Sequence, residues 1–86
     1  MNRLIIDVRE PFEYKMGHIE GAINLPPSQL MRGIPDALKD TARDTEIILY
    51  CLSGARSGAS IQILKNHGFT NLINGVNKDH VKAKYL

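Results

Sequence analysis

The stretch IILYCLSGARS, residues 47–57, joins a strand, a short loop and the start of a helix. Residues 47–50 form a continuous apolar run rich in β-branched side chains, which is typical of a strand covered on both faces in a parallel sheet. A helix is predicted from about residue 57 to residue 67, because apolar side chains recur at helical spacing and Gly68 can end the helix. The stretch therefore predicts a strand–loop–helix unit of an α/β fold.

Weaker strand and helix patterns alternate on both sides of this unit. Strands are also predicted at residues 4–8, 22–25 and 71–73. Short helical segments are predicted at residues 11–16, at 28–31 with Ser28 as the cap, at 35–42 and at 78–85. This alternation predicts a small, mostly parallel sheet of about four strands with helices on both faces, in three layers. No linker or repeat is visible, so we expect one domain over residues 1–86.

The composition excludes several classes of function. The chain has 86 residues, 11 basic and 9 acidic side chains, and a formal net charge of +2, with no basic run that would indicate nucleic-acid binding. A single cysteine allows no internal disulfide, and with three scattered histidines it does not make a metal site. No signal peptide or membrane-length apolar segment is visible, so we expect no membrane association and a cytoplasmic location. A periplasmic location is the alternative if the chain is a processed one.

Cys51 stands where an α/β sheet presents its chemistry, at the carboxyl end of a strand. The helix N-terminus, the loop amides and the Arg56 guanidinium would all favour a negative charge there. Such surroundings can lower the pKa of a cysteine from about 8.5 to roughly 3.5–7.5 and make it a nucleophile at neutral pH. The structural alternative is a buried apolar cysteine. We predict Cys51 as the catalytic residue, within an anion-binding loop made of Leu52, Ser53, Gly54, Ala55 and Arg56.

Several motifs resemble the rhodanese-homology family in its small, single-domain form. Residues 7–14, DVREPFEY, and residues 17–26, GHIEGAINLP, resemble the first motif of that family. Residues 50–57, YCLSGARS, resemble its active-site loop, and residues 68–72, GFTNL, resemble the segment after the active-site helix. The resemblance spans residues 4–75, and the order of the motifs makes it specific. It implies the three-layer rhodanese-like fold.

The resemblance also implies a thiosulfate sulfurtransferase. We expect it to need no cofactor and to act as a monomer. The Cys51 thiolate would take the outer sulfur of thiosulfate, release sulfite and hold a persulfide, which a thiol or cyanide would then accept. Arg56 would hold the shape of the loop and add positive charge, and Gly54 would allow its backbone to turn. The expected partners are therefore a small anionic donor and a thiophilic acceptor, with a persulfide-exchanging protein as a further candidate.

Other functions are weighed against this one. Cysteine phosphatases place five residues between the cysteine and the arginine, and this loop has four, which argues against phosphatase or arsenate-reductase activity. The main rival is a sulfur-carrier or redox-sensing module that acts through a partner protein. An inactive interaction domain is a third reading, against which the intact Cys51, Gly54 and Arg56 argue. Leu52 stands where many relatives carry a basic residue, which weakens the case for thiosulfate, a dianion, as the donor.

Residues outside the loop receive mostly structural interpretations. Asp7 and Arg9 flank the site at the end of a strand, and we expect them to hold neighbouring loops together. His18 is expected to be structural, because a thiolate needs no general base. Phe69 and Met31 are expected in the core or in a pocket wall. The turn that carries two glycines in the family is altered here to Asn-Gly-Val-Asn at residues 74–77.

Overall fold

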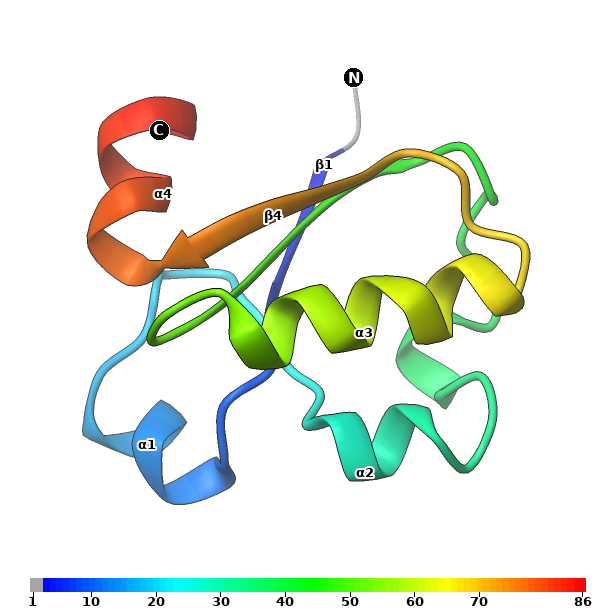
Figure 1. Ribbon diagram of the computed structural model, residues 1–86, viewed down its shortest axis with the longest axis horizontal. Helices are drawn as coiled ribbons and strands as arrows, with labels where there is room; N and C mark the ends of the chain where they lie inside the picture. The colour runs from blue at the N-terminus through cyan, green and yellow to red at the C-terminus, as the bar shows by residue number, and fades with distance from the viewer. Residues whose placement is uncertain (1–2) are drawn as a thin grey trace.

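The computed structural model describes residues 3–86, which form one parallel sheet with helices on both faces (Figure 1). The strand order is β2-β1-β3-β4, and every neighbouring pair is parallel. The strands are β1 Arg3–Asp7, β2 Ile23–Asn24, β3 Glu46–Cys51 and β4 Leu72–Asn77. The predicted small α/β sheet is therefore confirmed.

Helices from both halves of the chain cover the sheet. They are α1 Pro11–Met16, α2 Pro27–Leu30, the single 3-10 turn η1 Asp36–Leu38, α3 Ala55–Asn66 and α4 Lys78–Tyr85. In Figure 1, α2 and α3 lie next to each other, and α4 follows directly on the end of β4. Buried Leu30 of α2 and Leu64 of α3 pack on one face of the sheet, and Val81 of α4 packs on the other. This arrangement gives the three layers that the sequence predicts.

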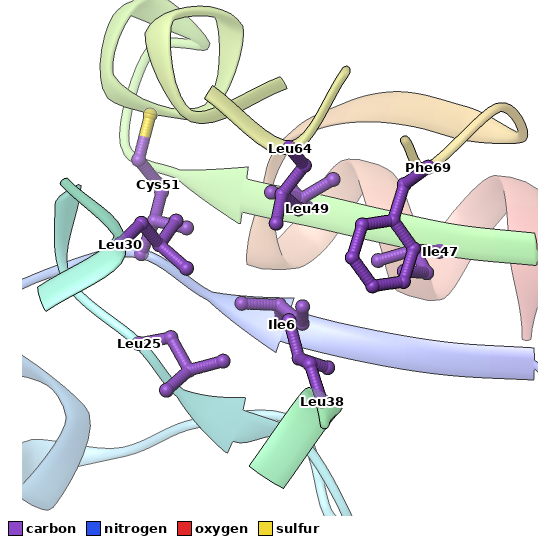
Figure 2. Close-up of a cluster of buried hydrophobic side chains, with 10 residues drawn as sticks. Ile6, Leu25, Leu30, Leu38, Ile47, Leu49, Cys51, Leu64 and Phe69 are labelled. Carbon is purple, nitrogen blue, oxygen red and sulfur yellow. The ribbon is translucent and has the colours of Figure 1, made fainter. Parts of the chain in front are cut away.

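The core follows the period-two alternation of the central strand β3. Ile47, Leu49 and Cys51 face the α2 and α3 side, whereas Ile48 and Tyr50 face the α4 side. Full burial of each such aliphatic side chain contributes roughly 1.5–3 kcal/mol. Figure 2 shows Cys51 at the end of the first of these rows, with its sulfur directed away from the apolar side chains. The strand therefore places the Cys51 sulfur at the edge of the apolar layer between the sheet and helices α2 and α3 (Figure 2).

Some predicted elements differ in extent from those in the structure. The helix expected at residues 35–42 is only the 3-10 turn, because the segment buries a single side chain, Leu38, and has no apolar face to pack. Ser28 does not cap α2, since Pro26 is the N-cap residue and Pro27 begins the helix. Met31 is 74% exposed, so its placement in the core or pocket wall was wrong, whereas Phe69 lies in the core.

Strand β4 is twice as long as expected because it contains a β-bulge. Asn74 pairs with Leu49 and Val76 pairs with Tyr50, so Gly75 is an extra residue with no partner on β3. Val76 adopts a positive φ of 70° at this point. The bulge lets β4 continue until Asn77 lies beside Cys51, and α4 begins at the next residue. The start of α4 is thereby placed at the same edge of the sheet as the sulfur.

No helix within residues 3–86 is long and apolar enough to span a membrane.

Candidate active site

Cys51 is the last residue of β3 and is 1% exposed, and it forms part of the wall of a pocket of about 280 Å³. The other lining residues come from the end of β1, the loop after β3 and the start of α4: Arg9, Leu52, Asn77, Lys78 and Asp79. A pocket of this volume is at the small end of the range that proteins use for small molecules. It lies beyond the carboxyl ends of the strands, as parallel α/β sheets place their ligands.

The loop after Cys51 turns a backbone amide onto the sulfur. Gly54 is the N-cap residue of α3 and has φ 95° and ψ −8°, a left-handed conformation that favours glycine. Its N–H donates to Cys51 Sγ at 3.1 Å. Ser57, in the first turn of α3, places its hydroxyl oxygen 3.5 Å from the same sulfur. Cys51 therefore meets polar groups from the loop and from the helix.

These contacts change the acidity of the thiol. Burial by itself raises the pKa of Cys51, because it disfavours the thiolate. Hydrogen bonds from the Ser57 side chain and from the backbone amides of Ser57, Ser53 and Gly54 outweigh burial and lower the pKa to about 7. The sulfur is therefore substantially ionised at neutral pH, which is the state in which a cysteine acts as a nucleophile.

Arg56 directs its guanidinium to Glu13 of α1 and also lies close enough to Cys51 for their charges to interact. Its two terminal nitrogens donate to the Glu13 carboxylate at 2.7 and 3.2 Å. This hydrogen bond and the Glu10 backbone lower the pKa of Glu13 to about 2. The ion pair fastens the first turn of α3 to α1, so the shape of the loop depends on a residue 43 positions earlier in the chain.

A buried polar network lies behind the pocket at the end of β1. Arg9 donates to both carboxylate oxygens of Asp7, at 2.9 and 2.6 Å, and to the Gly17 carbonyl at 2.7 Å. The hydroxyl of Tyr50 donates to the same carboxylate at 2.8 Å. Burial and the contact with Asp7 raise the pKa of Tyr50 to about 12, so this hydroxyl keeps its proton. Asp7 and Arg9 join three segments of chain, and Arg9 also forms part of the pocket wall.

The structure adds five residues that sequence reasoning did not assign to the site: Ser57 and Asn74 around the active-site loop, and Asn77, Lys78 and Asp79 in the pocket wall. Ser57 contacts the sulfur, and it could have been noticed because it is the last residue of the loop motif at residues 50–57. Asn74 accepts a hydrogen bond from Ser57 at 2.7 Å, and its only signal is the altered glycine turn. Lys78 lies on the pocket wall, and none of the ion pairs found in residues 3–86 includes it. No local pattern marks Lys78, because the bulge in β4 decides where it lies.

His18 lies outside the pocket lining. Its Nδ1 is 2.8 Å from the Tyr14 carbonyl oxygen, and its ring stacks on that of Tyr14 at 3.6 Å between centroids. These contacts tie the turn after α1 to the helix itself. Across the described part of the chain, no group of three or more histidine, cysteine, aspartate or glutamate side chains is arranged to hold a metal ion.

Comparison with known proteins gives a consistent result. The family model of the rhodanese-like domain matches residues 1–78. The thiosulfate sulfurtransferase PspE of Escherichia coli is 36% identical over 69 residues, which are 80% of this chain and 64% of that protein. The tRNA uridine(34) hydroxylase of Pectobacterium carotovorum is 34% identical over 71 residues, which are 80% of this chain and 20% of that protein.

A solved structure of a rhodanese from Escherichia coli with anions is similar in fold as well as in sequence. It is 30% identical, has a TM-score of 0.78, and the match covers 92% of this chain and 91% of that one. The chain spans less than two thirds of the length of the curated relatives named above. The matched family and the shared fold lead to one conclusion: this chain belongs to the rhodanese-like domain family, which includes sulfurtransferases.

Proposed function

We propose that this protein is a sulfurtransferase that moves a sulfane sulfur from thiosulfate or another donor to a thiophilic acceptor through a persulfide on Cys51. One observation carries the proposal: Cys51 forms part of the wall of a small pocket, and its sulfur receives the Gly54 N–H at 3.1 Å and has a pKa lowered to about 7. A buried cysteine with a purely structural role would need no such donors.

The reaction needs no co-reactant besides donor and acceptor. The Cys51 thiolate attacks the outer sulfur of thiosulfate, and a new S–S bond forms as the S–S bond of thiosulfate breaks. The bonding pair leaves with sulfite. An acceptor thiolate or cyanide then attacks the outer sulfur of the persulfide, and Cys51 departs as a thiolate. The loop amide that donates to the sulfur stabilises negative charge in both steps, because it is already oriented toward that atom.

Basic residues elsewhere in the pocket can supply the positive charge that the loop lacks at Leu52. Leu52 is apolar and 59% exposed, but Arg9 from the loop after β1 and Lys78 from α4 line the same pocket. Arg9 is committed to Asp7, which leaves the Lys78 ammonium as the cation that can turn to an incoming anion. Asp79 also lines the pocket and partly offsets this charge. We propose that Lys78 attracts the oxygen atoms of thiosulfate and so replaces a cation of the loop.

The second candidate is a sulfur-carrier or redox-sensing module that acts through a partner protein. Two observations support this second candidate. Leu52 presents an exposed apolar side chain at the pocket, where a protein partner can cover it. The chain also matches only 20% of the length of the tRNA uridine(34) hydroxylase, so domains of this kind occur within larger proteins. In this reading Cys51 holds the same persulfide but passes it on slowly without the partner.

Mass spectrometry of the intact protein after exposure to thiosulfate tests both readings. We expect the wild-type chain to gain one sulfur atom and Cys51→Ser to gain none, with circular dichroism showing that the variant is folded. Rapid conversion of cyanide to thiocyanate then supports the enzyme, and a stable adduct with slow conversion supports the carrier. If no adduct forms with thiosulfate or with a low-molecular-weight persulfide, the proposed function is wrong.

The cytoplasmic location and the monomeric state remain predictions. Cell fractionation with antibodies to the chain distinguishes the cytoplasm from the periplasm. Light scattering after gel filtration measures the mass of the particle in solution.

A further inference from the structure

Asn74 joins three parts of the molecule around the active-site loop. Its Nδ2 donates to the Gly54 carbonyl at 3.1 Å, and its Oδ1 accepts from the Val76 N–H at 3.0 Å and from the Ser57 hydroxyl at 2.7 Å. Asn74 lies on β4 immediately before the bulge, Gly54 in the loop and Ser57 in the first turn of α3. One side chain therefore ties β4 both to the loop and to the helix.

Two backbone groups set the orientation of the Asn74 amide. The N–H of Val76 can only donate a hydrogen bond, and the carbonyl of Gly54 can only accept one. Oδ1 therefore faces Val76, and Nδ2 faces Gly54. Because Ser57 contacts the same Oδ1, its hydroxyl must donate its hydrogen to Asn74.

The Ser57 hydroxyl has one hydrogen and two neighbours that compete for it. Ser57 is fully buried, and its oxygen also lies 3.5 Å from Cys51 Sγ. While the hydrogen points to Asn74, the oxygen presents a lone pair to the sulfur and can accept the hydrogen of the protonated thiol. A thiolate has no hydrogen to give, so the Ser57 hydrogen must turn to the sulfur for the contact to be favourable.

We propose that Asn74 is a positioning residue for Cys51: its Oδ1 holds the Ser57 hydrogen, and the sulfur must take that hydrogen from Asn74 when the thiol ionises. The inference rests on the proposed role of Cys51 as the nucleophile. Its consequence is a limit on how acidic the thiol becomes. A thiolate loses nucleophilicity as its pKa falls, and attack is fastest when that pKa is near the ambient pH. Competition from Asn74 keeps Cys51 in this range.

Charged groups near the sulfur are separate from this relay. Arg9 beyond β1, Arg56 on α3, and Lys78 and Asp79 at the start of α4 surround Cys51. The hydrogen bonds of Arg9 and Arg56 within residues 3–86 go to Asp7, Gly17 and Glu13 and include neither Ser57 nor Asn74. Substitution of Ser57 or Asn74 therefore leaves these charges in place.

A double-mutant cycle isolates the competition. The pKa of Cys51 is measured from the pH dependence of alkylation by iodoacetamide in the wild type, Asn74→Ala, Ser57→Ala and the double variant. Loosening of the loop through Gly54 acts with or without Ser57 and cancels in the cycle. We expect Asn74→Ala to lower the pKa of Cys51 by about one pH unit more when Ser57 is present than when it is absent. That difference is a tenfold change in the ratio of thiolate to thiol.

Controls keep the cycle interpretable. Asn71→Ala is the matched control: its side chain donates to the Asp44 carbonyl at the amino-terminal end of β4, opposite the end that carries the site, and the substitution should leave the pKa of Cys51 unchanged. If Asn74→Ala proves unfolded by circular dichroism, Asn74→Leu replaces it with the same expected sign. Equal effects with and without Ser57, or a rise in the pKa that requires Ser57, would overturn the inference. Alkylation needs no sulfur donor, so failure to form a persulfide would refute the proposed function without affecting this result.

Discussion

The sulfur of Cys51 has polar surroundings, whereas the other side chains on its face of the sheet have apolar ones. Ile47 and Leu49 on the same face are fully buried among apolar side chains. The sulfur, two residues further along the strand, points out of this layer toward the loop and α3 (Figure 2). Cys51 is almost completely buried, but hydrogen-bond donors of the loop and of α3 lie around its sulfur. A thiol in the apolar layer itself would have a raised pKa and would be inert.

The acidity of Cys51 is the first property to measure. The pKa of Cys51 is lowered to about 7, so the thiolate form predominates above neutral pH and the thiol form below it. The rate of alkylation by iodoacetamide should therefore rise between about pH 6 and about pH 8 and then level off. The chain unfolded in urea serves as the control, with a rate that keeps rising to higher pH. A folded protein that behaves like the unfolded chain would contradict the hydrogen-bond argument.

Lys78 should affect the capture of an anionic donor without affecting the thiol. We expect Lys78→Gln to raise KM for thiosulfate roughly threefold at low ionic strength, because a partly exposed charge interacts only weakly through water. Added salt should reduce the difference between the variant and the wild type. Lys82→Gln, an exposed lysine of the same helix outside the pocket lining, is the matched control. Equal effects of the two substitutions would indicate general attraction rather than a site.

Among the elements, β4 and α3 decide the geometry of the site. The pairing of β4 with β3 before the bulge places Asn74 against the loop, and the one-residue shift at Gly75 places Asn77 beside Cys51. Helix α3 begins at Ala55, two residues earlier than predicted, because Gly54 takes the left-handed N-cap conformation. That early start places Ser57 within the first turn, where it contacts the sulfur.

Substitution by alanine should change the stability of the fold in opposite directions at two glycines, one at the bulge in β4 and one in α3. A Cβ at Gly75 would lie 2.5 Å from Val81 Cγ2 and 2.9 Å from Ile48 Cγ2, so Gly75→Ala should destabilise the fold by about 1–3 kcal/mol. Gly58 is inside α3, and a Cβ there would meet only Asn74 Nδ2 at an ordinary 3.5 Å. Gly58→Ala should therefore stabilise the protein by up to about 1 kcal/mol. Urea unfolding measures both, and similar values for the two variants would contradict the packing at the bulge.

For the whole molecule, long-range polar contacts hold the layers in register around the site. The Glu13–Arg56 pair fastens α1 to α3, and the contacts of Asp7 with Arg9 and Tyr50 fasten β1 to the turn after α1 and to β3. Loss of Asp7 or Arg9 from the buried network would leave an uncompensated buried charge, which costs about 3–5 kcal/mol. The surface pair contributes less but depends on pH.

Stability at acid pH reports the Glu13–Arg56 pair. The pKa of Glu13 is lowered from an ordinary 4.5 to about 2, so the folded state favours the carboxylate. The stabilisation is complete above the ordinary pKa and is lost as the pH falls toward the lowered one. Glu13→Gln should therefore lower the melting temperature at neutral pH, and the difference from the wild type should shrink as the pH falls toward 2. Glu20→Gln, an exposed residue beyond α1, is the control, and a constant difference across this range would argue against the pair.

The amino-acid sequence by itself determined the parallel α/β class, the strand that ends at Cys51 and the loop that follows it. These features depend on local information: a β-branched apolar run needs cover on both faces, and a glycine allows the chain to turn directly after it. The family resemblance rests on the same contiguous residues, and the matched family confirms it. The prediction of a helix at residues 35–42 was wrong, because a weak helical propensity is overridden when only one side chain, Leu38, is buried.

Only the tertiary structure decided which distant residues meet the sulfur. Asn74 reaches Ser57 across 17 positions, and Glu13 reaches Arg56 across 43. The register of β4 against β3 controls the first contact and the placement of Lys78, and that register changes by one residue at the bulge. A shift of one residue turns every following side chain to the opposite face of a sheet, so such contacts cannot be inferred from spacing along the chain.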